Sequence, residues 1–486
     1  MKLERVLKGI TVESVIGDIS TNINSVCIDS RKCTKGSMFV AIAGTNTDGH
    51  QYIDVAIKSG ASVILCQVLP GNLMQNIVYV KVKETSYALG LAASNFFDNP
   101  SEKLKLVGVT GTNGKTTTAT LLYDIISSMG YPCGLLSTIK ILINNKEYPA
   151  THTTPDAVEL NRVMSEMVSS GCEYCFMEVS SHSIDQNRIA GLNFTGGVFT
   201  NITQDHLDYH KTMESYISVK QRFFTMLPRG SFALYNADDK NGHIMIQNSK
   251  AHIKSYSLLR PADYKAKIIS KQLEGMMLNI NNIDVWTSLT GQFNSYNLLA
   301  VYGTCMLLNF DQHETLLSLS IQQPVKGRFE RYRSETGVYV IVDYAHTPDA
   351  VTNVLQTIDD IRTGNEKVIT VMGAGGDRDK TKRPLMAKEA VRLSNVVILT
   401  SDNPRNEDPL SIIKDMEAGL KDFYNHVSLS IPDRREAIKT ACTMAQQGDI
   451  LLIAGKGHEN YQEIKGTKYP FDDMTEAVAI LKTIGK

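Results

Sequence analysis

A glycine-rich segment near residue 110 contains the residue types that bind a nucleoside triphosphate. Residues 111–117 read GTNGKTT, between a short apolar run and a stretch with helical character. Glycines let backbone N–H groups turn toward phosphate oxygens, and the N-terminus of a helix adds partial positive charge. Lys115 can reach the β- and γ-phosphates, and the Thr116 hydroxyl can join the ligand shell of a Mg²⁺ ion. Val109 stands where the strict motif has its first glycine, but Gly-Lys-Thr at a helix start still predicts a phosphate-binding loop.

Carboxylates and imidazoles follow two further apolar runs. Glu178 ends one run, in MEVSSH, and Asp205, His206, Asp208 and His210 follow another, in DHLDYH. Strand ends of one parallel sheet lie at the same edge, so these side chains could hold Mg²⁺ near the phosphate-binding loop. Spacing alone leaves open whether they bind a metal or are solvated loop residues.

Two other features have simpler interpretations. Lys220 lies among apolar residues in YISVKQRFF, which is typical of a surface lysine whose stem covers apolar surface. Cys172 and Cys175 have the spacing of half a zinc site, but no second Cys or His pair follows. Their apolar context predicts small core residues.

Four apolar runs in the last third of the chain each lead directly into a polar loop. The loops read DYAHTPD, GAGGDRDK, SDNPRNED and GKGHEN. Ligands of open parallel sheets bind outside the carboxyl ends of the strands. This edge of the predicted sheet is therefore expected to be a binding crevice.

The elements that must position these residues follow an α/β pattern. Short apolar runs alternate with helical stretches, which predicts layers built on largely parallel sheets. At ~150 residues per domain, 486 residues suggest about three domains. Pattern breaks place the domains at residues 1–102, 103–325 and 326–486. In the central domain we expect a helix from Pro155, helices around 213–227 and 294–308, and antiparallel strands at about 253–290 beside the main sheet.

The overall composition narrows the class of protein. Lys and Arg number 50 against 51 Asp and Glu, so no global basic field attracts nucleic acid. No apolar run approaches the ~18 residues of a membrane span, and the N-terminus lacks a secretory apolar region. Eight scattered cysteines are typical of reduced thiols. We therefore expect a cytoplasmic monomer that acts on small molecules.

Nine motifs taken in order resemble those of the Mur ligases, the ATP-dependent amide-bond-forming enzymes of peptidoglycan synthesis. They read GTNGKTT, MEVSSH, NRIAGL, FTNITQDHLDYH, GRFE, DYAHTPD, GGDRDK, DNPR and GKGHE, and the resemblance extends from DSR at 29–31 to AGKGHE at 454–459. It implies an N-terminal domain for a uridine nucleotide, a central ATPase domain and a C-terminal Rossmann-like amino-acid-binding domain. It also implies that ATP phosphorylates the D-glutamate carboxylate of UDP-N-acetylmuramoyl-L-alanyl-D-glutamate, and that the amine of meso-2,6-diaminopimelate attacks the acyl phosphate.

The resemblance also implies the residues that handle ATP and metal. Lys115 would serve the γ-phosphate, and Thr116 and Glu178 match ligands of one Mg²⁺. His206 matches the ligand of a second Mg²⁺. Lys220 falls where relatives carry a lysine carbamylated by CO₂. Such a carbamate orients the metal or its waters, so the resemblance opposes the interpretation of Lys220 as a surface residue. The implied ATP contacts are Gly111, Thr112, Asn113, Gly114, Lys115, Thr116, Thr117, Asn294, Arg328 and Asp343.

The same resemblance assigns the other two substrates. The implied contacts to the uridine substrate are Ile28, Ser30, Thr45, Asn46 and Thr47, and those to its muramoyl-peptide part are Thr153, Thr154, Ser180, Gln186 and Arg188. The implied diaminopimelate pocket is Arg378, Asp402, Asn403, Pro404, Arg405, Gly455 and Glu459. DNPR favours diaminopimelate over lysine, because Arg405 can pair with the distal carboxylate while Glu459 takes the distal ammonium.

Two other hypotheses compete with this one. A sibling ligase could add D-glutamate, a terminal dipeptide, or glutamate to folate, or act like a cyanophycin synthetase, but DSR, VSSH and DNPR argue against it. A P-loop regulatory protein would bind nucleotide without joining substrates. Such a switch has no need of a third domain with an amino-acid pocket.

Overall fold

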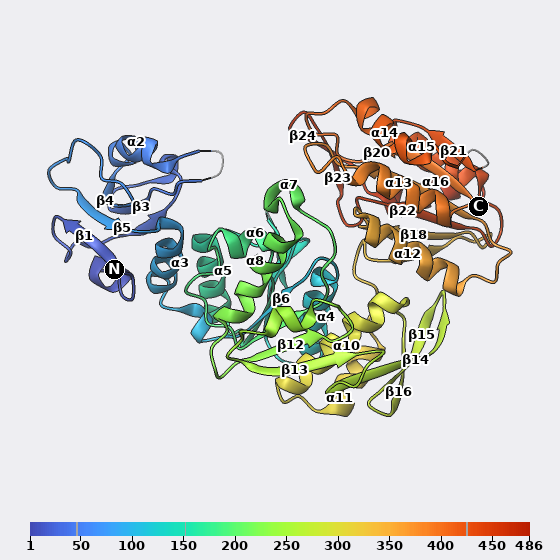
Figure 1. Ribbon diagram of the computed structural model, residues 1–486, viewed down its shortest axis with the longest axis horizontal. Coiled ribbons are helices and arrows are strands. Elements are labelled where there is room, and N and C mark those ends of the chain that lie inside the picture. The colour runs from blue at the N-terminus through green and yellow to red at the C-terminus, as the bar shows by residue number, and fades with distance from the viewer. Residues whose placement is uncertain (45–46, 151, 424–425) are drawn as a thin grey trace.

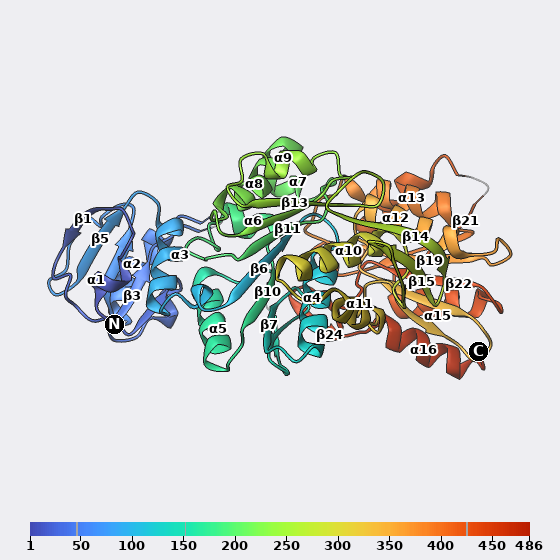
Figure 2. The same cartoon turned by 90° about the horizontal axis from the view of Figure 1, so that it is seen from below.

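Three large β-sheets, which follow one another along the chain, divide the protein into three α/β lobes, and β23 (Tyr461–Ile464) and β24 (Thr467–Pro470) of the third lobe form a small two-stranded sheet of their own (Figure 1). The computed structural model describes residues 1–44, 47–150, 152–423 and 426–486. The N- and C-terminal lobes lie at opposite ends of the central lobe in both views (Figure 2). The predicted α/β class with three domains is confirmed. Each sheet falls within one of the predicted ranges 1–102, 103–325 and 326–486, whose boundaries remain predictions.

The N-terminal lobe is built on a five-stranded sheet in the order β1-β5-β4-β3-β2. Its elements are α1 (Leu3–Val6), β1 (Val12–Ile16), β2 (Ser25–Cys27), η1 (Ser30–Lys32), β3 (Ser37–Val40), η2 (Gly49–Tyr52), α2 (Ile53–Lys58), β4 (Ala61–Cys66), β5 (Val78–Val82), α3 (Thr85–Phe96) and η3 (Pro100–Glu102). Strands β2 to β5 are parallel, and β1 joins the edge in the antiparallel direction. Strand β1 is mostly exposed, so the sequence shows no buried apolar run there.

The central lobe contains an eleven-stranded sheet whose middle is parallel. Its strands are β6 (Lys105–Thr110), β7 (Cys133–Leu136), β8 (Lys140–Ile143), β9 (Lys146–Pro149), β10 (Tyr174–Glu178), β11 (Gly196–Phe199), β12 (Phe232–Asn236), β13 (His252–Ser257), β14 (Tyr264–Gln272), β15 (Gly275–Ile280) and β16 (Ile283–Thr287). Strands β14 to β16 form the expected antiparallel set. The expectation was wrong for β13, which pairs in parallel with β12 and so extends the main sheet. The local sequence pattern of β13 does not indicate which strand it pairs with.

Helices cover both faces of this sheet. They are α4 (Lys115–Ser128), α5 (Ala157–Ser169), α6 (Ser181–Asp185), α7 (Leu207–His210), α8 (Met213–Met226), α9 (Gly242–Ile246), α10 (Gln292–Leu307) and α11 (Gln312–Ser320). The expected start of a helix at Pro155 was wrong by two residues. The Asp156 carboxylate accepts hydrogen bonds from the N–H groups of Val158 and Glu159, so Asp156 is the N-cap and the helix begins at Ala157.

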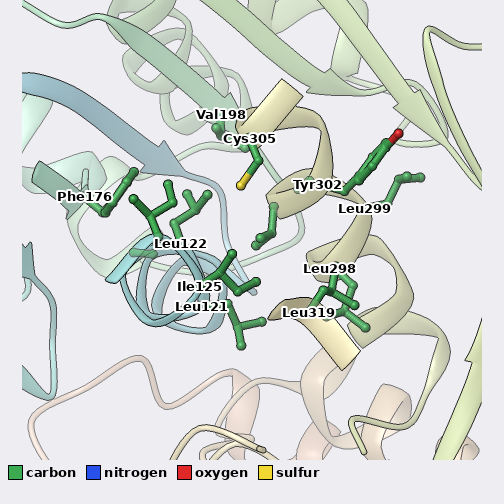
Figure 3. Packing of buried hydrophobic residues seen from close by; sticks show 14 of the residues in the cluster. Leu121, Leu122, Ile125, Phe176, Val198, Leu298, Leu299, Tyr302, Cys305 and Leu319 are labelled. Carbon is green, nitrogen blue, oxygen red and sulfur yellow. The ribbon is translucent and has the colours of Figure 1, made fainter. Parts of the chain in front are cut away.

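The helix that follows the phosphate-binding loop is held by an apolar interface with α10. Side chains of α4 lie next to those of α10 and α11, as Figure 3 shows for Leu122, Ile125 and Leu298. All three are fully buried. Burying one such side chain contributes about 1.5–3 kcal/mol relative to its exposed state. The packing therefore fixes the N-terminus of α4, where Lys115 lies.

The C-terminal lobe has a six-stranded sheet in the order β17-β18-β22-β19-β20-β21, parallel except at β17. Its elements are β17 (Glu330–Arg333), β18 (Tyr339–Asp343), α12 (Pro348–Ile361), β19 (Val368–Ala374), α13 (Lys382–Leu393), β20 (Val396–Ser401), α14 (Pro409–Glu417), η4 (Ala418–Leu420), β21 (Val427–Ser430), α15 (Arg434–Met444), β22 (Ile450–Ala454), β23 (Tyr461–Ile464), β24 (Thr467–Pro470) and α16 (Asp473–Thr483). The four predicted polar loops follow β18, β19, β20 and β22, which are parallel. All four loops therefore leave the same edge of the sheet.

All eight cysteines lie among the described residues, and each is buried with a free thiol. Cys172 and Cys175 are core residues, as predicted. Within the described ranges, no helix is both long enough and apolar enough to cross a membrane.

Candidate active site

The phosphate-binding loop joins the end of β6 to the start of α4. Gly114 has φ +85°, and a Cβ atom there would lie 2.4 Å from Oδ1 of Asn297. A Cβ atom on Gly111 would lie 1.9 Å from Oγ1 of Thr200. Both positions need glycine, because the loop backbone lies directly against these two side chains. Val109, at the position of the strict motif's first glycine, is a fully buried residue of β6.

The loop borders a cleft of about 490 Å³ between the central and C-terminal lobes. This volume is within the ~300–1,000 Å³ of small-molecule sites. The implied ATP and metal residues that line it are Thr112, Asn113, Gly114, Lys115, Thr116, Thr117, Glu178, His206, Lys220, Arg328 and Asp343. Residues that are far apart in the sequence are thus assembled around one space.

Lys115 is the first residue of α4 and a cation of this cleft. Its Nζ donates to the main-chain oxygens of Gly111 at 2.9 Å and Thr112 at 2.7 Å. Burial lowers the pKa of Lys115, whereas the nearby carboxylates of Glu178 and Asp205 favour its charged form. An ammonium group at a helix N-terminus is well placed for phosphate oxygens.

Glu178, at the end of β10, offers this cleft an unsatisfied carboxylate oxygen. Its Oε1 accepts from the backbone N–H of Thr138 at 2.6 Å, whereas Oε2 is buried without a hydrogen-bond partner. The Thr116 hydroxyl lines the same cleft. One carboxylate, one hydroxyl and phosphate oxygens suit Mg²⁺, so these residues fit the ion. No three His, Cys, Asp or Glu side chains form a metal site within the described part of the chain, so substrate and water would have to complete the shell.

Asp205 and His206 line the same cleft, where the chain turns into α7. His206 has a left-handed backbone with φ +54°, and its Nε2 is 3.4 Å from Oδ2 of Asp205. The edge of its ring meets His182, with 4.9 Å between ring centroids. Burial holds the pKa of His206 below its usual range. A neutral imidazole keeps a lone pair for a cation, as the proposed metal role requires.

The remaining two polar side chains of DHLDYH lie elsewhere. Asp208 is exposed on α7, and the His210 ring is hydrogen-bonded to the Ser181 hydroxyl at 2.9 Å. Neither lines the cleft between the lobes. Asp208 therefore fits the interpretation as a solvated residue, whereas the buried and hydrogen-bonded His210 fits neither interpretation.

Lys220 is buried, which contradicts the surface position expected from composition. It lies on α8 with 1% exposure, and its Nζ donates to the Gly111 oxygen at 2.8 Å. Burial and the positive charge of Lys115 lower its pKa well below the ordinary value, although Asp205 opposes this. The ammonium contacts the Tyr216 ring at 4.9 Å from its centroid. Tertiary packing of α8 against the end of β6 buries a residue that helical periodicity alone places on the surface.

Arg328 and Asp343 extend the site into the C-terminal lobe. Arg328 Nη2 donates to Oγ1 of Thr116 at 3.1 Å, and its guanidinium lies 4.5 Å from the centroid of the Tyr344 ring. Oδ2 of Asp343 accepts from the backbone N–H of Phe329 at 2.7 Å. Burial raises the pKa of Asp343 to about 6. Asp343 therefore fixes the backbone next to Arg328.

Two implied ATP residues, Gly111 and Asn294, do not line the cleft. Asn294 is buried in the first turn of α10, and its amide nitrogen donates to the Thr290 oxygen at 2.8 Å. It does not line the cleft, whereas Asn297, one turn later, does. Asn297 donates to Oδ1 of Asn294 at 3.2 Å. Nucleotide contact by Asn294 stays a prediction.

Two further polar contacts, besides that of Arg328 with Thr116, join the central and C-terminal lobes beside the phosphate-binding loop. Asn113 Nδ2 donates to Oδ2 of Asp349 at 3.1 Å. Lys382 Nζ lies 3.9 Å from Oδ1 of Asp205. The C-terminal lobe thus contacts both the phosphate-binding loop and the turn that carries His206.

The implied muramoyl-peptide residues lie together on the central lobe. Arg188 donates to the main-chain oxygen of Thr154 at 2.8 Å and to Oε1 of Gln186 at 2.6 Å. Thr153 and Ser180 line the same cleft as the phosphate-binding loop. A bound carboxylate at Thr153 would therefore be near the ATP residues.

The implied uridine residues lie on the N-terminal lobe, away from this cleft. Ser30 is buried at the start of η1, whereas Ile28 and Thr47 are exposed. Thr45 and Asn46 lie outside the described residues.

The implied amino-acid residues meet at the carboxyl ends of β20 and β22. Nδ2 of Asn403 donates to Oε2 of Glu459 at 2.6 Å. A Cβ atom on Gly455 would lie 2.5 Å from Oδ2 of Asp402, so the strand end needs glycine there. Burial and the charge of Asp402 raise the pKa of Glu459, whereas Lys456 lowers it. A ligand ammonium would compensate these two carboxylates.

Arg405 is held in place by the loops around it. Its Nη1 donates to the Gly376 oxygen at 2.8 Å, and its Nε lies 3.6 Å from Oε2 of Glu463. Its backbone is left-handed, with φ +51°. Arg378 is exposed on the neighbouring loop, and Gly375 separates the two arginine side chains. The side chains of Arg405 and Arg378 thus both lie beside the backbone of Gly375.

The sequence motifs did not single out several residues of the cleft and of the implied amino-acid pocket. Those that line the cleft include Asn201, Thr203, Tyr344, His346 and Asp349, and Lys456 is fully buried beside Asn403 and Glu459. All lie inside or next to quoted motifs, so the motifs gave the only available signal. No local pattern shows which motif residues point inward.

Sequence models of three Mur ligase domains match consecutive parts of the chain. The Mur ligase family catalytic domain matches residues 22–96, the Mur ligase middle domain residues 109–305, and the Mur ligase glutamate ligase domain residues 327–457. These ranges agree with the three lobes.

Several curated and solved proteins are similar over the full length. A protein of Cytophaga hutchinsonii is 52% identical over 100% of both chains, and one of Phocaeicola vulgatus is 54% identical over 97% of this chain and 98% of its own. Both are named UDP-N-acetylmuramoyl-L-alanyl-D-glutamate–2,6-diaminopimelate ligase. A solved structure of that name has a TM-score of 0.70 and 31% identity, covering 100% of this chain and 99% of that one. A solved structure from Acinetobacter baumannii, with a TM-score of 0.65 and 15% identity over 99% and 98% of the chains, shows the fold alone.

Proposed function

Because the chain belongs to the Mur ligase family, we propose that it joins meso-2,6-diaminopimelate to UDP-N-acetylmuramoyl-L-alanyl-D-glutamate and converts ATP to ADP and phosphate. It is an ATP-dependent acid–amino-acid ligase of peptidoglycan synthesis. ATP and Mg²⁺ are its cosubstrate and metal. The observation that carries this proposal is the single cleft that combines the phosphate-binding loop, Glu178 and Arg328 with Thr153 and Ser180.

The chemistry explains why these residue types share one cleft. A carboxylate is a poor electrophile, and its phosphorylation supplies phosphate as a leaving group. The γ-phosphoryl group moves to the D-glutamate carboxylate, the amine attacks the acyl carbon, and phosphate departs. Both steps carry several negative charges, so catalysis depends on positioning and electrostatic stabilisation. Lys115 and Arg328 supply fixed positive charge at the loop.

Mg²⁺ at this site supplies charge neutralisation for the phosphate oxygens. Thr116 and Glu178 would hold one ion, and His206 would hold a second near the acceptor carboxylate. The free Oε2 of Glu178 supports the first assignment. The neutral ring of His206 supports the second.

Lys220 is proposed to act as a carbamate. Its neutral amine would attack CO₂ to form an N–C bond and release one proton, which leaves a carboxylate beside the loop. The depressed pKa supports this because only the uncharged amine is nucleophilic. Its burial next to Gly111 supports a role at the loop rather than on the surface.

We expect Lys220→Ala to be nearly inactive and to recover part of its activity with short carboxylic acids, because such an acid can occupy the place of the carbamate. The measurement is ligation rate against acetate or formate concentration. Lys115→Ala is the matched control, because an acid cannot replace a lost cation. A bare ammonium in the electron density of a fully active, metal-bound enzyme would contradict the carbamate.

The C-terminal lobe is proposed to bring the amine to the acyl phosphate. The phosphate-binding loop is on the central lobe, and the carboxylates of Asp402 and Glu459, which are implied to bind the amino acid, are on the C-terminal lobe. The reacting atoms must approach to ~3–3.5 Å, so the two lobes have to close around both ligands. Arg328 and Asp349 already connect the lobes to the loop.

Small-angle scattering should therefore detect a more compact enzyme with all ligands than without them. A non-hydrolysable ATP analogue alone serves as the control, because it leaves the amino-acid pocket empty. Superimposable profiles in every condition would argue against a large closure. That the enzyme works as a monomer in the cytoplasm stays part of the proposal.

The proposal is tested by phosphate release in a full matrix of substrates. We expect release only when ATP, the UDP-linked dipeptide and an amino acid are all present. Release that needs neither of the last two would instead indicate a nucleotide switch. Release with a different UDP-linked acceptor would indicate a sibling ligase.

A further inference from the structure

Two cysteines of the N-terminal lobe are in direct contact. Sγ of Cys27, at the end of β2, lies 2.8 Å from Sγ of Cys33, which follows η1. Non-bonded carbon atoms prefer ~3.5–4.0 Å, and sulfur is larger than carbon, so this separation is unusually short. A disulfide needs about 2.05 Å, so a shift of about 0.8 Å would bring the sulfurs to bonding distance. Among the described residues, which include every cysteine, no other pair of thiols is in hydrogen-bonding contact.

The pair lies in a small apolar core beneath an exposed turn. Both thiols are buried with Phe39, Ile64 and the lone thiol of Cys66. Burial raises the pKa values of Cys27 and Cys33, so both are protonated thiols at neutral pH. Once one cysteine has formed a mixed disulfide, the sulfur of the other cysteine can attack it without a large movement, because the two sulfur atoms are already in contact.

Two of the residues between the two cysteines, Ile28 and Ser30, are among those implied to bind the uridine substrate. Ile28 is exposed, Ser30 is buried at the start of η1, and the Asp29 carboxylate caps that turn through the N–H of Arg31. The Cys33 thiol also donates to the main-chain oxygen of Asp29 at 3.8 Å. A covalent link between Cys27 and Cys33 would therefore close a small ring around this turn.

We propose that Cys27 and Cys33 form a reversible disulfide that weakens binding of the UDP-linked substrate, a consequence that rests on the proposed function. The oxidant is a small-molecule disulfide. One cysteine loses its proton, and its thiolate attacks the oxidant, breaks the S–S bond of the oxidant, forms a mixed disulfide and releases one thiol. The second cysteine sulfur attacks the mixed disulfide and releases the other thiol. The two protons of the cysteines end on the released thiols, and the oxidant gains the two electrons.

The covalent step is tested on the full chain with oxidised glutathione, followed by alkylation and tryptic digestion without reductant. Trypsin cleaves after Arg31 and Lys32, so the disulfide must join peptide 9–31 to peptide 33–35. We expect this joined peptide after oxidation and its loss after dithiothreitol. Cys33→Ala removes it, whereas Cys66→Ala, which deletes a thiol of the same core, retains it. Absence of the joined peptide from oxidised native enzyme overturns the proposal.

The functional step is tested by the KM for the UDP-linked dipeptide before and after oxidation. We expect a rise of about five-fold, comparable to the loss of one hydrogen bond, and its reversal by dithiothreitol. The Cys33→Ala enzyme should show no such rise. An unchanged KM in fully cross-linked enzyme would overturn the proposal that the disulfide weakens binding of this substrate. If the reduced enzyme cannot ligate this substrate at all, the proposed function fails, while the peptide result still decides whether the disulfide forms.

Discussion

Replacing Lys115 or Thr116 with alanine should abolish ligation, a loss of about a hundred- to a thousand-fold or more, while the fold stays intact. Lys115→Ala removes the cation at the N-terminus of α4, and Thr116→Ala removes the hydroxyl proposed to hold Mg²⁺. Neither side chain belongs to the apolar interface that anchors α4. Lys115 also lies near the positive charge of Arg328, so its removal relieves repulsion.

The readouts are ligation rate and thermal unfolding on the same preparations. Lys140→Ala is the matched control in the central lobe, because Lys140 pairs with Glu147 at 3.0 Å on the protein surface. It should keep the parent rate. Ligation by either loop variant within a few-fold of the parent would refute the assignment of the phosphate-binding loop.

Arg405→Ala should lose roughly a hundred-fold or more in kcat/KM for diaminopimelate. Diaminopimelate differs from lysine by a carboxylate on its distal carbon, and burying that group without a partner costs free energy. Arg405 presents a planar guanidinium fork, which the Gly376 oxygen holds in place. Lysine should not suffer the same loss, because it lacks the carboxylate.

Two variants sharpen this test. Arg405→Lys keeps the charge but loses the fork, so it should recover only part of the efficiency. Arg435→Ala removes an exposed arginine of the same lobe that pairs with Glu476, and it should behave like the parent. Equal losses of kcat/KM for diaminopimelate and lysine in Arg405→Ala would show that Arg405 does not bind the distal carboxylate.

Local patterns predicted the parts of the site that local sequence determines. GTNGKTT specifies a strand, a glycine turn and a helix N-terminus within a few residues, and the structure has all three. The alternation of apolar runs and helices likewise predicted the three α/β lobes. The edge strand β1 was missed because it is mostly exposed and shows no buried apolar run.

Features that depend on distant residues could not be predicted in this way. Lys220 has the helical context of a surface lysine, and only the end of β6 buries it. Asn113 and Asp349 are 236 positions apart, so nothing in either motif indicates their hydrogen bond. Cys27 and Cys33 are close in sequence, but the turn between them decides whether their sulfurs meet.

Addition of diaminopimelate to the UDP-linked dipeptide is the activity that we assign to this enzyme. The most direct test is competition between meso-diaminopimelate and L-lysine at equal concentration, with ATP, Mg²⁺ and UDP-N-acetylmuramoyl-L-alanyl-D-glutamate, read out by product mass and ADP formed. We expect the diaminopimelate product in clear excess, with one ADP for each amide bond. Preferential incorporation of lysine, or ADP formation without a ligated product, would contradict it.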